Sequence, residues 1–157
     1  MAEIGVTYSS LVGLILKLHR GARSGATQTL AAKALGVAHH STVVRLEQGD
    51  GCVNVEQLAL LARFFGTSPA ELLSDADKLA SVLCWAGVHV LPARAGLLQR
   101  SASDVCEVFE GDMFQLFLDV EPRTNTGDFI FRHRLAPLER IRAAYQALPP
   151  NAKRWHV

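Results

Sequence analysis

The sequence is poor in cysteine and has no segment that could serve as a membrane anchor. Its three cysteines, Cys52, Cys84 and Cys106, are widely spaced and form no Cys-X-X-Cys pair. This usage argues against a disulfide framework and is typical of a reducing compartment. The apolar run at residues 11–16 is too short to cross a bilayer, and it has neither a basic leader nor a cleavage site. We therefore expect a cytoplasmic protein with no membrane partner.

Acidic residues are absent from residues 5–46, although the whole chain is close to neutral, with 16 basic and 15 acidic residues. The same segment holds His19, His39, His40 and five basic residues, which are Lys17, Arg20, Arg23, Lys33 and Arg45. By contrast, residues 47–77 hold six acids and one base, Arg63. A surface of purely positive charge suits a polyanion.

Motifs of the common enzyme classes are also missing. The chain has no nucleophile elbow, phosphate-binding loop, HExxH sequence or pair of catalytic carboxylates. We interpret the acidic residues between Asp104 and Asp112 as a solvated face or turn. His39 and His40 have no cysteine or carboxylate nearby at metal-ligand spacing. We therefore expect neither an enzyme nor a bound metal or cofactor.

Apolar residues at helical spacing predict a series of short helices in the first half of the chain. We expect a first helix over residues 9–20 and a third over residues 40–48. The second, fourth and fifth begin at N-cap signals, and Gly36 and Gly66 read as helix ends. These N-cap signals are Thr27, Asn54 and Ser68 followed by Pro69. The side chains expected to face inward are Leu11, Leu14, Ile15, Leu18, Ala31, Ala32, Leu35, Val55, Leu58, Leu61, Ala62, Phe65, Leu72 and Leu73, with Val43, Val44 or Leu46 from the third helix.

Beyond residue 74 the pattern is less regular. Residues 76–91 are apolar and fit a helix or a strand, and residues 92–96 form a break. Residues 105–120 fit a helix or a hairpin; we favour the hairpin, because Gly111 between two acids favours a turn. A strand at 129–131 and a final amphipathic helix at 138–148, with Ile141, Tyr145 and Leu148 inward, complete the prediction. The expected fold is mainly α, with a domain over residues 1–74 and a smaller α+β region over 75–157.

Residues 8–74 resemble the helix-turn-helix domain of the Cro/C1-type repressors, the xenobiotic-response-element family. The resemblance implies a five-helix, lambda-repressor-like domain that binds DNA, although the segment between Gly36 and Gly49 is slightly longer than is usual in that family. The matching residues are Thr27-Gln28, Ala31-Ala32, Leu35-Gly36-Val37, the run 43–49, Val55-Glu56, Leu58, Ala62, Gly66, Ser68 and Glu71-Leu72.

The third predicted helix is the candidate for reading bases, because Arg45 can donate two hydrogen bonds to guanine. Two alternatives stay open for these residues. Arg45 could form a surface ion pair with Glu47 or Glu56, and His39 and His40 could form only a polar loop. The resemblance further implies a structural role for Glu47, which would tie this helix to the first near Arg20. The predicted base contacts are His39, His40, Ser41, Thr42 and Arg45. The predicted phosphate contacts are Thr27, Gln28, Lys17, Arg20, Arg23 and Lys33.

These features predict a sequence-specific, DNA-binding transcriptional regulator. We expect it to act on double-stranded DNA as a homodimer that pairs through residues 75–157 and reads a palindromic operator. Two alternatives stay open. The chain could be an antitoxin-like interaction module whose C-terminal half binds a protein partner, or a repressor whose C-terminal half senses a small molecule.

Overall fold

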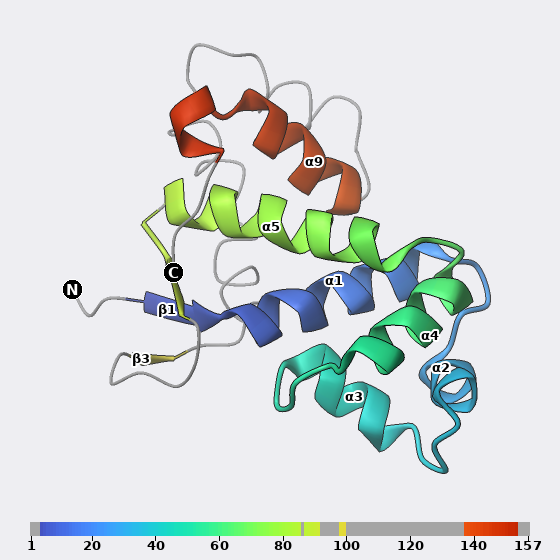
Figure 1. Cartoon of the computed structure of the whole chain (residues 1–157). Coiled ribbons are helices and arrows are strands. Elements are labelled where there is room, and N and C mark those ends of the chain that lie inside the picture. The colour runs from blue at the N-terminus through green and yellow to red at the C-terminus, as the bar shows by residue number, and fades with distance from the viewer. Residues whose placement is uncertain (1–3, 86, 92–97, 100–136, 154–157) are drawn as a thin grey trace.

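The protein is mainly helical, as predicted (Figure 1). The computed structural model describes residues 4–85, 87–91, 98–99 and 137–153. The elements, in chain order, are β1 (Ile4–Thr7), α1 (Tyr8–Ala22), α2 (Gln28–Leu35), α3 (Ser41–Gln48), α4 (Val55–Phe65), α5 (Pro69–Trp85), β2 (His89–Leu91), β3 (Leu98–Gln99), α9 (Pro137–Ala147) and the 3-10 turn η1 (Pro150–Ala152).

The helix ends follow the capping chemistry of the sequence. Thr27 accepts a hydrogen bond from the Leu30 amide at the start of α2. Asn54 and Gln57 cap α4 reciprocally, since each side chain bonds the backbone amide of the other. Gly49 ends α3 at a φ of 75°, and a Cβ at this position would lie 2.6 Å from the Ser10 Cα. Glycine is therefore required at the end of α3 for both its conformation and its size.

Most of the predicted inward positions are buried, and two predictions were wrong. Val55 is 83 % exposed, because it is the first residue of α4 and lies before the helix reaches the core. Leu73 is 38 % exposed, because the buried face of α5 includes Leu72, Asp75 and Ala76, and the position directly after Leu72 lies on the outer side of the helix. Of the three alternatives on α3, Val43 and Leu46 are buried and Val44 is half-buried.

The ambiguous segment at 76–91 forms both a helix and a strand. Helix α5 continues to Trp85, and β2 then covers His89–Leu91. The predicted helix at 138–148 is present as α9 (Pro137–Ala147), with Ile141 and Leu148 buried and Tyr145 half-buried. The predicted hairpin within 105–120 and the strand at 129–131 lie outside the described residues.

A small parallel sheet was not predicted. Strand β1 lies in the centre and pairs with β2 on one side and β3 on the other. Its register places Val6 beside Val90 and Gly5 beside Gln99. Because β1 is four residues long and its partners follow much later in the chain, no local pattern announced it.

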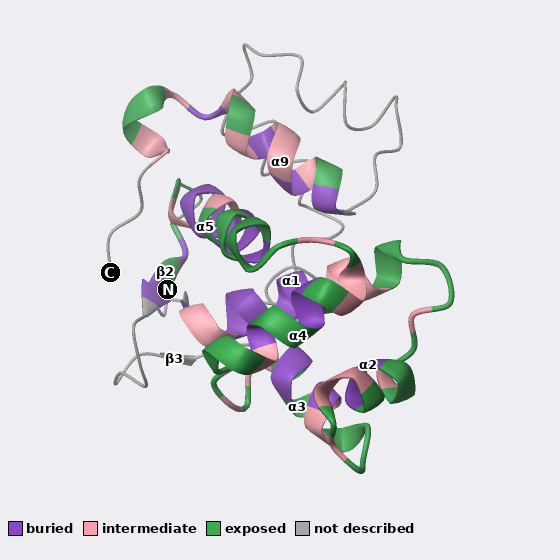
Figure 2. Ribbon diagram, turned by 45° about the vertical axis from the view of Figure 1, so that its right-hand side comes forward, coloured by how far each residue is buried: buried purple, intermediate pink, exposed green. Residues whose placement is uncertain are grey.

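Helix α5 lies at the centre of the molecule, with α1 on one side and α9 on the other (Figures 1 and 2). Leu72 and Leu79 of α5 share one core with Leu11 and Ile15 of α1, and Ile141 of α9 reaches the same core. A second, smaller cluster joins Val82 to Ala144 and Leu148. The predicted domain boundary after residue 74 falls within α5, and the division of the chain there stays a prediction.

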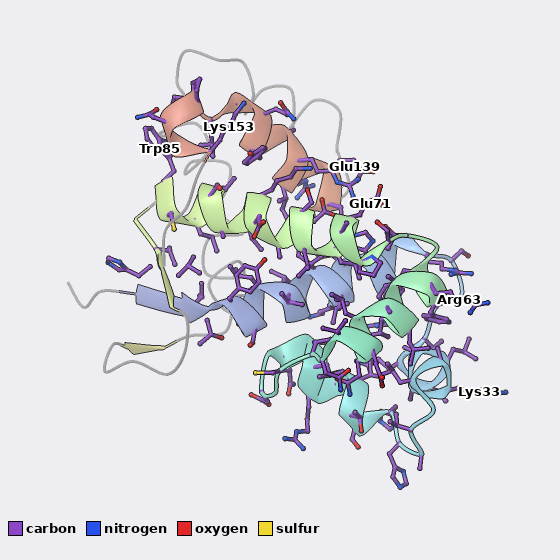
Figure 3. The ribbon with its side chains drawn as sticks, in the orientation of Figure 1. Lys33, Arg63, Glu71, Trp85, Glu139 and Lys153 are labelled. Atoms are coloured by element: carbon purple, nitrogen blue, oxygen red, sulfur yellow. The ribbon has the colours of Figure 1, made fainter. Side chains whose placement is uncertain are left out.

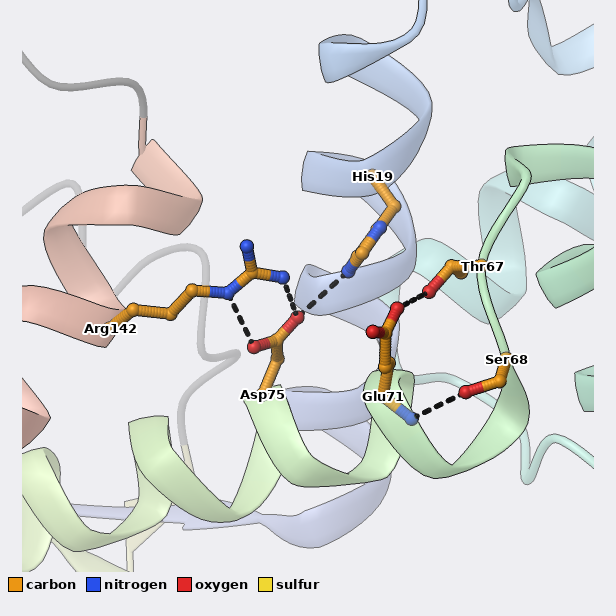
Figure 4. Close-up of polar contacts among 6 residues, drawn as sticks. All are labelled: His19, Thr67, Ser68, Glu71, Asp75 and Arg142. Atoms are coloured by element: carbon orange, nitrogen blue, oxygen red, sulfur yellow. Dashed lines mark hydrogen bonds and ion pairs between the residues drawn. The ribbon is translucent and has the colours of Figure 1, made fainter.

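The three central helices also meet at a buried carboxylate, Asp75, which is 2 % exposed. Arg142 of α9 donates from Nε and Nη2 to its two oxygens over 2.9 and 2.8 Å. His19 of α1 donates from Nε2 to Oδ2 over 2.9 Å (Figure 4). Burial alone would raise the pKa of Asp75, but the hydrogen bonds from His19 and Arg142 and the charge of Arg142 outweigh it and lower the pKa from 3.8 to about 2.

Gly13 is predicted to set the spacing between α1 and α3. A Cβ at Gly13 would collide with the Leu46 carbonyl oxygen and lie 2.8 Å from that of Glu47. We expect Gly13→Ala to lower the free energy of unfolding by about 1–3 kcal/mol, because the backbones must separate. Gly21→Ala is the matched control, since a Cβ there meets no atom within 4 Å. It should instead stabilise α1 by about 0.5–1 kcal/mol. Urea titrations followed by circular dichroism measure both, and equal effects would contradict the proposed close contact.

The stability of the protein should depend on pH through Asp75. The pKa of Asp75 in the folded state lies below its unfolded value. Its contribution to the free energy of unfolding is therefore complete above about pH 4 and is lost as the pH falls from 3.8 to about 2. We expect Asp75→Asn to cost about 2 kcal/mol at pH 7. The difference from the parent protein should shrink below pH 4 in urea titrations at a series of pH values. Asp50→Asn, at an exposed position, serves as the control; a constant difference for Asp75→Asn across this range would refute the linkage.

Candidate nucleic-acid interface

Helices α2 and α3 and the turn between them form a protruding unit at the edge of the bundle (Figure 1). Gly36 ends α2 in the left-handed conformation, at a φ of 72°, and redirects the chain toward α3. Helix α3 then packs against α1 through Val43 and Leu46, which are 3 % and 6 % exposed. One side of α3 is therefore fixed in the core while its other side is free to meet a partner.

The predicted base-contacting residues lie on the free side of α3 and in the turn before it. Arg45 and Ser41 are exposed and lie four positions apart, so they share one helix face. Thr42 is half-buried, whereas the exposed His39 and His40 precede the helix. The structure thus brings the five residues together on one continuous stretch at the surface.

A network of polar side chains holds α3 in place. The Glu47 carboxylate, 6 % exposed, accepts hydrogen bonds from Arg20 of α1 at 2.5 Å (Nε to Oε1) and 3.2 Å (Nη2 to Oε2). Gln28 of α2 donates from Nε2 to Oε2 over 3.0 Å. The expected contact between Glu47 and Arg20 is therefore present, and it includes a third helix that the sequence did not indicate. Glu47 therefore anchors α3, because its buried carboxylate joins this helix to both α1 and α2.

Two of the predicted phosphate contacts, Arg20 and Gln28, are part of this network. The side chains of Arg20 and Gln28 both point to Glu47, so they are already engaged within the protein. Gln28 is nevertheless the first residue of α2, and helix geometry leaves its backbone amide without an intrahelical acceptor. Thr27 caps only the Leu30 amide. The start of α2 can thus bind phosphate through its backbone, as helix N-termini do.

The other predicted phosphate contacts are distributed over the surface. Lys17, Arg23 and Lys33 are all exposed. The Arg23 guanidinium carbon lies 5.4 Å from the centre of the Phe64 ring, a cation–π contact. Figure 3 shows Lys33 pointing outward from α2, on the same side of the molecule as Arg63 of α4. Arg63 is exposed and was not among the predicted contacts.

The alternative pairing of Arg45 has no support among the described residues. Glu47 is occupied by Arg20 and Gln28, and no ion pair involving Arg45 occurs in the described part of the chain. Within the same residues, no group of three or more histidine, cysteine or acidic side chains could hold a metal ion. None of the described helices combines the length and apolar character needed to cross a membrane.

Comparison with known proteins agrees with this geometry. Residues 12–74 match a family model described as a helix-turn-helix domain. The match begins within α1 and ends within α5, so it includes α2, α3 and the turn between them. Searches of curated proteins and of solved structures gave no match. Residues 12–74 thus carry a helix-turn-helix domain.

Removal of the Glu47 carboxylate should loosen α3 from the bundle. Glu47→Ala leaves the half-buried Arg20 guanidinium without its partner, and loss of one member of a buried pair typically costs about 3–5 kcal/mol. Gln48→Ala, at an exposed position on the same helix, should change the free energy of unfolding by less than about 0.5 kcal/mol. Chemical denaturation compares the two variants. If Glu47→Ala lowered the free energy of unfolding by no more than Gln48→Ala does, the network would not anchor α3.

Proposed function

We propose that this helix-turn-helix protein is a sequence-specific, DNA-binding transcriptional regulator that acts as a homodimer on a palindromic operator. The observation that carries the proposal is the two-sided character of α3. Its inner side is fixed by Val43, Leu46 and the Glu47 network. Its outer side carries exposed polar residues that belong to the acid-free segment 5–46. A rigidly held helix with such an outer face fits the major groove, where base edges are distinguishable.

In this proposal, Arg45 supplies the main base discrimination. Its guanidinium is exposed on α3 and can donate two parallel hydrogen bonds to O6 and N7 of guanine. Ser41 lies one turn earlier on the same face and can bond a neighbouring base edge, while Thr42 offers a methyl group to thymine. His39 and His40 stand at the entry to the helix, where base contacts are concentrated in helix-turn-helix proteins.

Phosphate contacts supply the remaining affinity. The backbone amides at the start of α2, beside Thr27 and Gln28, bind one phosphate with the help of the helix dipole. Lys17, Arg23 and Lys33 add positive charge at exposed positions. These contacts are independent of sequence and weaken steeply with salt. The protein should therefore bind any duplex weakly and its operator tightly, with both affinities falling as salt increases.

Pairing of two chains would double the length of sequence that is read. Two recognition helices about 34 Å apart contact successive major grooves on one side of a duplex. We assign the pairing to residues 75–157. The described part of this region, α5 beyond residue 74 with α9, packs on the DNA-binding bundle, so that pairing there would fix the relative placement of the two α3 helices.

Two substitutions separate the roles assigned to base and phosphate contacts. Arg45→Ala should cost about 1–3 kcal/mol of operator binding and relax the preference at one base pair. Lys33→Ala should weaken binding to all duplexes alike and lower the salt slope by about 1. Fluorescence-anisotropy titrations at several salt concentrations, with operator and scrambled duplexes, measure both. Identical behaviour of the two variants would show that the assigned roles are incorrect.

The proposed function itself is tested by selecting bound sequences from random duplexes. A palindromic consensus with half-sites one helical turn apart is the expected result. A consensus with a single half-site would support DNA recognition and refute the dimer. Absence of any complex with duplex DNA in dilute buffer would refute the proposal as a whole.

A further inference from the structure

A continuous series of side-chain contacts connects α9 with Arg23, a predicted phosphate contact that directly follows α1. It begins with the two hydrogen bonds from Arg142 to Asp75 and continues with the bond from His19 to the same carboxylate. The His19 ring stacks on Phe65, with ring centres 6.2 Å apart and an angle of 25° between the planes. The ring centres of Phe65 and Phe64 are 5.5 Å apart, and the Arg23 guanidinium lies over the Phe64 ring.

The first part of this series is tightly constrained. Arg142 uses two parallel hydrogen bonds, a geometry that fixes the plane of the Asp75 carboxylate. Because Oδ2 also accepts from His19, the direction of that bond depends on how Arg142 holds the carboxylate. Figure 4 shows Arg142 and His19 approaching Asp75 from different helices. The carboxylate is nearly inaccessible to water, so no solvent molecule can easily replace either donor.

The second part of the series connects the position of His19 with that of Arg23. The His19 side chain is 10 % exposed and lies between Asp75 and Phe65, so a change in its direction must move the ring with which it stacks. Phe64 and Phe65 are adjacent in α4 and in contact, and the Arg23 guanidinium lies over the Phe64 ring. Arg23 follows directly after α1, where its own backbone amide bonds the Arg20 carbonyl.

We propose that Arg142 is a positioning residue for DNA binding: docking of α9 through Asp75 sets the place of His19 and, through the Phe65–Phe64 pair, that of the phosphate-binding Arg23. The inference rests on the proposed function, because it gives Arg23 a role at DNA. It makes α9 part of the binding apparatus rather than a separate appendage. A partner or effector that displaces α9 would thereby weaken the hold of the protein on DNA.

The placement of Arg23 can be measured without DNA. Protons of the Arg23 side chain lie over an aromatic ring, so their NMR signals are shifted upfield by the ring current of Phe64. Arg142→Ala should move these signals toward their unshifted positions, whereas Gln146→Ala, at an exposed site on the same helix, should leave them unchanged. Arg142→Lys keeps the charge but lacks the paired donors, and it should move the signals in the same direction by less. Unchanged Arg23 signals in the folded Arg142→Lys and Arg142→Ala proteins would overturn the proposal.

A double-mutant cycle tests the consequence for DNA. On the selected operator, Arg142→Ala should weaken binding about three- to tenfold. In an Arg23→Ala background the same change should matter by less than about twofold, because the positioned group is already gone. A simple loss of one positive charge would instead give effects that add in full, and this result would also overturn the proposal. If the Arg23 signals respond as expected but the parent protein binds no duplex, the proposed function fails while the positioning of Arg23 by Arg142 stands.

Discussion

The arrangement of the helix-turn-helix unit depends on one buried carboxylate. Glu47 accepts hydrogen bonds from Arg20 and Gln28, so a single side chain of α3 binds α1 and α2 at once. An unpaired charge at this depth would be costly, and the fold avoids that cost only if the three helices keep their relative positions. Apolar contacts such as Val43 and Leu46 hold α3 against α1 without fixing its angle. The directional bonds to Glu47 supply that angle, and therefore the direction in which Arg45 points.

A second buried carboxylate repeats the principle on the other side of α1. Asp75 joins α5 to α1 through His19 and to α9 through Arg142. The two acids lie near opposite ends of the acid-rich segment 47–77, and their partners on α1, Arg20 and His19, are neighbours in the sequence. The end of α1 is thus held from two sides at once. This shared attachment explains why the bundle that carries α3 and the helix that follows much later in the chain form one core.

The sequence predicted the local parts of this structure and missed the long-range parts. Caps such as Thr27 and Asn54 and the glycine ends of α2 and α4 act within one helical turn, so the sequence alone located these helices. The contact of Glu47 with Arg20 was foreseen from a family resemblance, not from residue chemistry. The bond between Asp75 and Arg142 and the pairing of β1 with β2 join residues dozens of positions apart. No periodicity reports such contacts, because they depend on how the helices pack.

The central place of β1 in the sheet has a consequence for biosynthesis. The first described residues pair with His89–Leu91 and with Leu98–Gln99, so the sheet cannot form until those later segments have left the ribosome. The helices between them involve contacts that are closer in sequence and can assemble earlier. During translation the apolar Val6, which is fully buried in the folded protein, therefore stays unpaired until Val90 has been synthesised. Strand β1 is therefore synthesised before both of its partners and can become ordered in the sheet only after they have been made.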